Sequence, residues 1–267
     1  MAETLDVSVQ VHDYGSAFEG MLVVNADSIL LGINSRVQNQ HRKKFTCAHE
    51  LGHLTMDIGV DGGTFQCAGK DMESYSKKVD AVEVRANRFA AELLLPKFLI
   101  ETSVKDNELS WKSIKDLAGS GDVSLTAAAK KFIEHTDEAC ALVVSENKLI
   151  KWFQASPNFL FKMDMDGRVL SDASKAHGMF ANGGAMSDFE EVAALTWISS
   201  GSARRDDKIL EWSLPLDSYG RVLTLLWDDQ GIAEENIEKE MDGDSDDTFD
   251  PKYGWETPTF HKSKRKR

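Results

Sequence analysis

The feature that most constrains this chain is the run His49-Glu50-Leu51-Gly52-His53. Side chains four residues apart lie on one face of an α-helix, so a helix would bring both imidazoles to a single metal ion. Apolar residues at helical spacing predict a helix from about Phe45 to Ile58, with Gly59 as its end. The sequence therefore predicts His49 and His53 as metal ligands.

Glu50 follows the first histidine and can project toward a water held by the metal. Zinc lowers the pKa of such a water from about 15.7 to about 7. A carboxylate beside it can take the proton as hydroxide attacks a peptide carbonyl, and can then pass it to the leaving amine. Glu50 is therefore the predicted general base. Gly52, on the same helix, leaves room for close packing of a second helix or another backbone.

A motif this short also arises by chance, and two ordinary histidines on a polar helix face would produce it. Two features argue against that alternative. The flanking residues Phe45, Ala48, Leu54 and Ile58 predict a buried helix, in which unpaired imidazoles would be costly. The chain also offers a third ligand.

A catalytic zinc needs three protein ligands and one open position. An extended form of the motif adds a glycine and a third histidine, but Met56 and Gly59 hold those positions here, which excludes that form. The other common third ligand is a glutamate on a later helix. A helix is predicted from about residue 78 to 95, and Glu83 lies on its core-facing side. We therefore predict Glu83 as the third ligand.

Four other carboxylates are weaker candidates for that position. Glu92 is rotated away on the same helix and is expected in solvent. Asp57, Asp61 and Asp80 lie in or beside residues 59–75, which are interpreted as a loop because of their glycines.

Two stretches resemble the ImmA/IrrE family of metallopeptidases. They are FTCAHELGHL at residues 45–54 and EVRANRFAAELLLP at residues 83–96, in the order and at the distance typical of that family. The resemblance implies a small zincin-like fold, a zinc ion held by His49, His53 and Glu83, and Glu50 as the base. Several members are bacterial or phage enzymes that cleave helix-turn-helix repressors. Asp57 departs from the pattern, because relatives often carry a histidine there.

The whole chain is predicted to be α+β, in four parts. Residues 1–107 form a zincin-like metallopeptidase domain, and residues 108–137 a helix-turn-helix-like pair of short helices. Residues 138–230 form a β-rich C-terminal domain with hairpins at 141–154 and 211–227 and a helix at 190–198. Residues 231–267 are rich in charge and are expected to be a disordered tail.

Composition limits where the protein acts and what it binds. The formal net charge of −13 works against loose binding to nucleic acid. Lys130 and Lys131 on the second short helix are offset by nearby acidic residues, so direct nucleic-acid binding is not expected. Three cysteines, no signal-peptide pattern and no long apolar stretch predict a cytoplasmic protein without membrane association.

The expected function is a zinc endopeptidase that cleaves a regulatory protein, with a helix-turn-helix repressor as the expected partner. Manganese is the alternative metal. Two other functions remain open. One is a non-enzymatic regulator, stabilised by metal, that binds a repressor in the manner of an anti-repressor or antitoxin. The other is a DNA-binding factor with an inert peptidase-like domain, which the net charge disfavours. The oligomeric state does not follow from the sequence.

Overall fold

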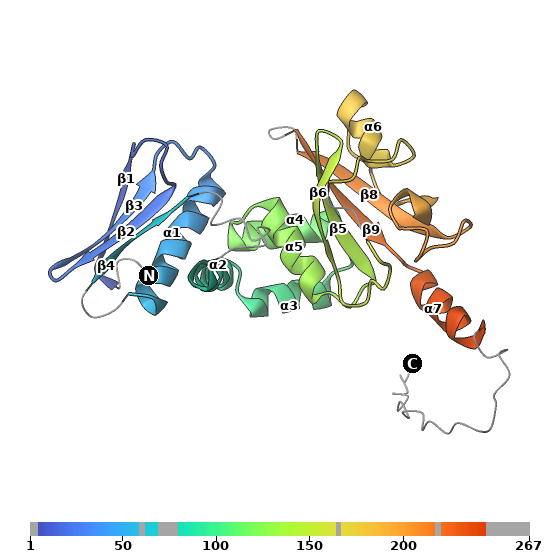
Figure 1. Ribbon diagram of the computed structural model, residues 1–267, viewed down its shortest axis with the longest axis horizontal. Coiled ribbons are helices and arrows are strands. Elements are labelled where there is room, and N and C mark those ends of the chain that lie inside the picture. Colours follow the sequence, from blue (N-terminus) through green and yellow to red (C-terminus); the bar gives the residue numbers. More distant parts are fainter. Residues whose placement is uncertain (1–4, 59–61, 69–79, 164–166, 217–219, 244–267) are drawn as a thin grey trace, which may run out of the picture.

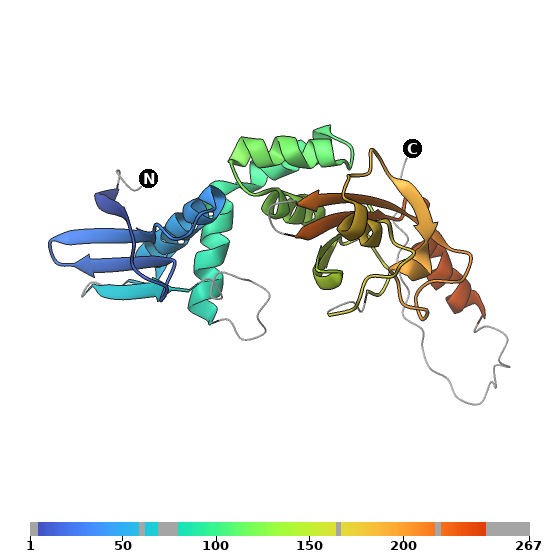
Figure 2. The same cartoon turned by 90° about the horizontal axis from the view of Figure 1, so that it is seen from above.

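The computed structural model describes residues 5–58, 62–68, 80–163, 167–216 and 220–243. Within these ranges the chain forms two separate sheets and seven α-helices (Figure 1). The fold class is α+β, as predicted. The first sheet with helices α1 and α2 forms one end of the molecule and the second sheet the other. Helices α3, α4 and α5 lie between them (Figure 2).

The first sheet has four strands in the order β1-β3-β2-β4. Their bounds are β1 Val7–His12, β2 Gly20–Asn25, β3 Ser28–Asn34 and β4 Gly63–Cys67. Strand β1 pairs with β3 in parallel, and the other pairs are antiparallel. Strand β4 is an edge strand that the sequence analysis missed, because residues 59–75 were interpreted as a loop.

Helix α1, Gln40–Met56, packs on this sheet and carries the histidine motif. The Asn39 side chain caps it by accepting the Arg42 N–H. Leu51 joins Leu22, Leu31 and Ile33 of the sheet in one small core. Helix α2, Ala81–Leu94, then packs against α1 and ends before Pro96, as predicted.

Three helices connect the two sheets. They are α3 Lys97–Asp106, α4 Trp111–Gly121 and α5 Leu125–His135. The predicted two-helix segment corresponds to α4 and α5, whose first turns are capped by the side chains of Ser110 and Ser124. Their apolar faces pack in one core with Leu142 and Leu223 of the second sheet. The apolar side chains of α4 and α5 are therefore buried against the second sheet.

The second sheet is antiparallel, in the order β6-β5-β9-β8-β7. Its bounds are β5 Cys140–Glu146, β6 Leu149–Ala155, β7 Glu190–Ala193, β8 Lys208–Leu216 and β9 Arg221–Trp227. Alternate residues of β5 face opposite cores: Leu142 lies in the core with α4 and α5, whereas Val143 lies in the core on the other side. The β5–β6 hairpin turns at Asn147 and Lys148, both with positive φ.

Two predictions for the C-terminal half were wrong. Residues 190–198 form strand β7 and a 3₁₀ turn, Ala194–Thr196, instead of a helix, because Val192 pairs with Ile209 of β8. The tail predicted as disordered begins with helix α7, Ile232–Gly243, whose Ala233 is buried against the second sheet's core. The rest of the predicted tail, residues 244–267, lies outside the described residues.

The remaining helix, α6 Lys175–Asn182, is short and lies between β6 and β7 in the sequence. None of the helices in the described ranges is both long and apolar enough to cross a lipid bilayer.

Candidate metal centre

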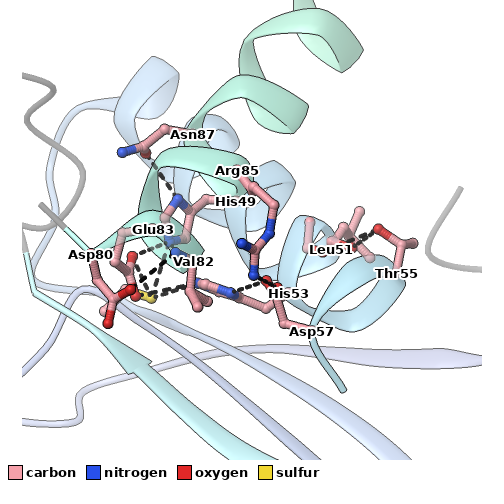
Figure 3. A network of polar contacts seen from close by, with 12 residues as sticks. His49, Leu51, His53, Thr55, Asp57, Asp80, Val82, Glu83, Arg85 and Asn87 are labelled. Carbon is pink, nitrogen blue, oxygen red and sulfur yellow. Dashed lines mark hydrogen bonds and ion pairs between the residues drawn. The ribbon is translucent and has the colours of Figure 1, made fainter. Parts of the chain in front are cut away.

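Helix α1 presents His49 and His53 on one buried face, as the four-residue spacing predicts. Both residues are 0% exposed, and their Nε2 atoms are 3.0 Å apart. The ring of His53 is also stacked on Phe65 of β4, with 4.6 Å between ring centroids. The two imidazoles therefore converge on one point between α1, α2 and the edge of the sheet (Figure 3).

Glu83 reaches the same point from the first turn of α2. Its Oε2 lies 3.0 Å from His49 Nε2, and its Oε1 lies 3.6 Å from His53 Nε2. Gly52 permits the close approach of α2, because a Cβ at that position would lie 3.1 Å from the Cα of Ala86. The close helix packing predicted for Gly52 is confirmed. The three residues predicted as ligands are thus brought together.

A fourth donor, the thiol of Cys67 at the end of β4, was not predicted. Its Sγ lies 3.1 Å from His49 Nε2, 3.5 Å from His53 Nε2 and 4.0 Å from Glu83 Oε2. The four residues form a group whose ligand atoms all lie within 4.8 Å of one another. No spacing pattern links Cys67 to the histidines, so only the pairing of β4 with β2 could have indicated it.

Outer hydrogen bonds hold both imidazoles with Nε2 toward the centre. His49 Nδ1 lies 3.0 Å from Asn87 Oδ1, and His53 Nδ1 lies 3.0 Å from Asp57 Oδ2. Arg85 in turn donates to Asp57 Oδ1 at 2.5 Å (Figure 3). A partner that accepts the Nδ1 proton leaves Nε2 with a lone pair for a metal. Asp57, a weaker candidate for the third ligand, takes this supporting place instead.

The remaining candidates for the third ligand lie elsewhere. Asp80 caps the start of α2 by accepting the Val82 N–H. Glu92 is exposed, as expected, and accepts a hydrogen bond from the Lys97 N–H. Asp61 lies outside the described residues.

Glu50 lies beside this group and is 0% exposed. Neither of its carboxylate oxygens has a hydrogen-bond partner among the described residues. Burial raises the pKa of Glu50 to about 7, and the nearby Cys67 thiol and the two imidazoles offset only part of that rise. Gly20 of β2 makes room for the carboxylate, because a Cβ there would lie 2.6 Å from Glu50 Oε1.

The contacts between Glu83 and the histidines shift the pKa values of Glu83 and His53. Burial alone would raise the pKa of Glu83, but hydrogen bonds from His49 and His53 outweigh it and lower the pKa to about 2. Burial alone would lower the pKa of His53, but its contacts with Glu83 and Asp57 outweigh that effect and raise it. A divalent cation would be attracted to the same carboxylate, and the two imidazoles would bind it in their neutral form.

The donor set suits a zinc ion. Two imidazole nitrogens, a carboxylate oxygen and a thiolate sulfur are all ordinary zinc ligands. In metallopeptidases an H-E-x-x-H helix places a glutamate beside the two histidines as the general base, and Glu50 lies at that position. The fold and the site together fit a metallopeptidase-type domain, with a possible metal-binding group that includes a carboxylate from the helix after the histidine motif.

Comparison with known proteins identifies the family. The model of the Peptidase_M78 family, described as the IrrE N-terminal-like domain, matches residues 2–132. This N-terminal part of the chain, from β1 through most of α5, belongs to the ImmA/IrrE family of peptidases. An uncharacterized immunity region protein 2 of Bacillus phage phi105 is 36% identical over 87 residues, which cover 33% of this chain and 50% of the phage protein. The chain thus matches about half the length of that relative.

Proposed function

We propose that this chain is a zinc-dependent endopeptidase that cleaves a regulatory protein. His49, His53 and Glu83 would hold the metal, and manganese is the alternative ion. The observation that carries the proposal is that the Glu50 carboxylate is buried beside the candidate ligands without a hydrogen-bond partner among the described residues. A buried carboxylate with no hydrogen-bond partner is costly to the fold, so it is best explained by a task in chemistry beside the metal.

The chain's own groups fit the proton transfers of peptide hydrolysis. A zinc ion in this site supplies Lewis-acid chemistry, which polarises a carbonyl and makes water a stronger acid. A nearby cation favours the ionised form of Glu50, which is the form that a base needs. Glu50 would take the proton of the attacking water and deliver it to the leaving amine. Asn87 and Asp57 would keep the imidazoles oriented during these steps.

The substrate class is inferred from the family. Several members cleave helix-turn-helix repressors, and the phage relative is described as an immunity region protein. We therefore propose a helix-turn-helix repressor as the partner that is cut, in the cytoplasm of a bacterial host.

A survey of new protein N-termini in host cells tests this function. Cells would express the wild type, Glu50→Gln, or the control Glu101→Gln, which changes an exposed glutamate of α3. The expected result is a set of termini in one helix-turn-helix protein that appears with the wild type and the control but not with Glu50→Gln. Equal termini with Glu50→Gln, at equal metal content, would refute the role of Glu50.

One observation favours a second function. With Cys67 the site offers four protein donors, and closed four-ligand zinc sites are typical of structural metals. The chain would then be a metal-stabilised protein that inactivates a repressor by binding it. Loss of repression while the repressor chain stays intact would support this alternative.

A further inference from the structure

The donor groups of four residues, His49, His53, Cys67 and Glu83, converge on one point at the candidate metal centre. The separations among His49 Nε2, His53 Nε2, Cys67 Sγ and the Glu83 oxygen that faces each of them run from 3.0 to 4.0 Å. One ligand atom from each of the four residues lies within 4.8 Å of the other three. A tetrahedral zinc ion with ligand bonds of about 2.0–2.3 Å places its ligands about 3.3–3.8 Å apart. The spacing of the donors is therefore close to the spacing that one four-coordinate zinc ion needs, and one of the four donors is a sulfur atom.

The position of Cys67 is fixed by the sheet. It lies opposite Gly20 in the β2–β4 ladder, and its carbonyl accepts the Glu19 N–H at 2.9 Å. The residue is only 1% exposed. The ordinary explanation of a buried cysteine is a small apolar filler. Cys140 fits that explanation, because it lies in an apolar core, whereas Cys67 faces two imidazoles and a carboxylate.

The neighbouring Glu50 gives independent support for a cation at this point. Its carboxylate is buried, lacks a hydrogen-bond partner among the described residues, and lies beside the same thiol and imidazoles. A metal ion at the centre of the four donors would compensate its charge.

We propose that Cys67 is a fourth, inhibitory ligand of the metal. This inference rests on the peptidase function proposed above and concerns its regulation. Three protein ligands leave the position that a catalytic zinc keeps open for water, and a fourth closes it. Cys67 would thus compete with water for this position and slow the peptidase without abolishing its activity, and the site would be active whenever water displaces the sulfur. The exchange replaces one ligand by another, and the sulfur keeps its oxidation state and takes a proton from solvent.

A thiolate ligand also selects the metal. Sulfur ligands favour zinc, whereas manganese prefers oxygen donors. Cys67 therefore directs the site toward zinc in the resting protein. Loss of this sulfur is expected to lower zinc affinity by at least about tenfold, since even the weaker outer partners of a ligand contribute that much. Manganese affinity is expected to change little.

The direct test is X-ray absorption at the zinc edge of the full-length, zinc-loaded protein. The wild type should show one sulfur at about 2.3 Å beside nitrogen and oxygen ligands. Cys67→Ser should lose the sulfur signal, and Cys67→Ala should also lose it and exclude ligation by the serine hydroxyl. Cys47→Ser is the matched control, because Cys47 lies on α1 outside the donor group, and it should keep the signal. Only nitrogen and oxygen ligands in the wild type would overturn the proposal.

The inhibitory role needs a second readout, because coordination alone would not establish it. At saturating zinc, the Glu50-dependent termini described above should increase in cells expressing Cys67→Ser relative to wild type and Cys47→Ser. A sulfur ligand in the wild type with no increase in Cys67→Ser would overturn the inhibitory role. A sulfur ligand with no Glu50-dependent cleavage in any variant would instead refute the peptidase function and leave the coordination of Cys67 in place.

Discussion

Replacing Glu50 by Gln should stabilise the metal-free protein at alkaline pH. Burial raises the pKa of Glu50 from 4.5 to about 7 in the folded chain. The native state then holds a proton that the unfolded chain has released, so the free energy of unfolding falls as the pH rises from about 4.5 to about 7. The stability that depends on a protonated Glu50 is therefore fully present below about pH 4.5 and is lost as the pH rises through about 7.

The expected loss is about 3 kcal/mol, since each pH unit of that interval corresponds to about 1.36 kcal/mol. Glu50→Gln removes this contribution because an amide does not titrate. The free energy of unfolding of Glu50→Gln, relative to that of the wild type, should therefore be about 3 kcal/mol higher at pH 8 than at pH 4.5. This difference is about a hundredfold in the equilibrium constant for opening.

Amide hydrogen exchange of helix α1 is the suitable assay. Every tryptophan lies at or beyond position 111, so intrinsic fluorescence reports on other parts of the chain. Exchange in α1 peptides, corrected for the intrinsic effect of pH, gives the free energy of opening around Glu50. Zinc-loaded protein is the control, and it should lack the fall because the cation favours the ionised carboxylate. Equal pH dependence in metal-free wild type and Glu50→Gln would refute the reasoning.

Three further substitutions test the contacts around the site, and a fourth, Gly119→Ala, is the control for one of them. Gly20→Ala should reduce Glu50-dependent cleavage while metal content, measured by mass spectrometry, stays the same, because the new Cβ would meet the Glu50 carboxylate; unchanged cleavage would contradict this. Asn87→Ala should lower zinc affinity by about 10- to 100-fold in a chelator competition, and equal affinity would exclude its orienting role. Gly52→Ala should destabilise the chain by about 1–3 kcal/mol because of its contact with α2, whereas Gly119→Ala, with open space around it, should stabilise by about 0.5–1 kcal/mol; thermal unfolding that shows the same sign for both would contradict the packing argument.

Sequence patterns predicted the elements whose stability is local. Helices α1 and α2 follow from apolar residues at helical spacing, and the pair α4 and α5 and the hairpin β5–β6 also follow from local sequence patterns. Strand β4 was missed because its residues become a strand only by pairing with β2, about forty positions earlier. For the same reason residues 190–193 form a strand against β8, although their own pattern suggests a helix.

The site divides in the same way. His49, His53 and Glu83 could be predicted to meet, because a helix sets the spacing of the first two and the inward face of α2 sets the third. Cys67 could not be predicted, since the sheet brings it to the site. Asp57 lies four residues after His53, so the helical spacing alone indicates that the two side chains can meet. The supporting role of Asp57 could not be predicted, because it depends on which ring nitrogen of His53 faces Asp57.

Cleavage by purified protein is the most direct test of the central claim. Full-length chain would be mixed with the repressor identified by the survey of N-termini, first with zinc, then after chelation, and then with zinc restored. We predict that cleavage stops on chelation, returns with zinc, and is absent in Glu50→Gln, although that variant still binds one zinc ion per chain. Cleavage by metal-loaded Glu50→Gln at the wild-type rate, or cleavage that persists without metal, would contradict the account.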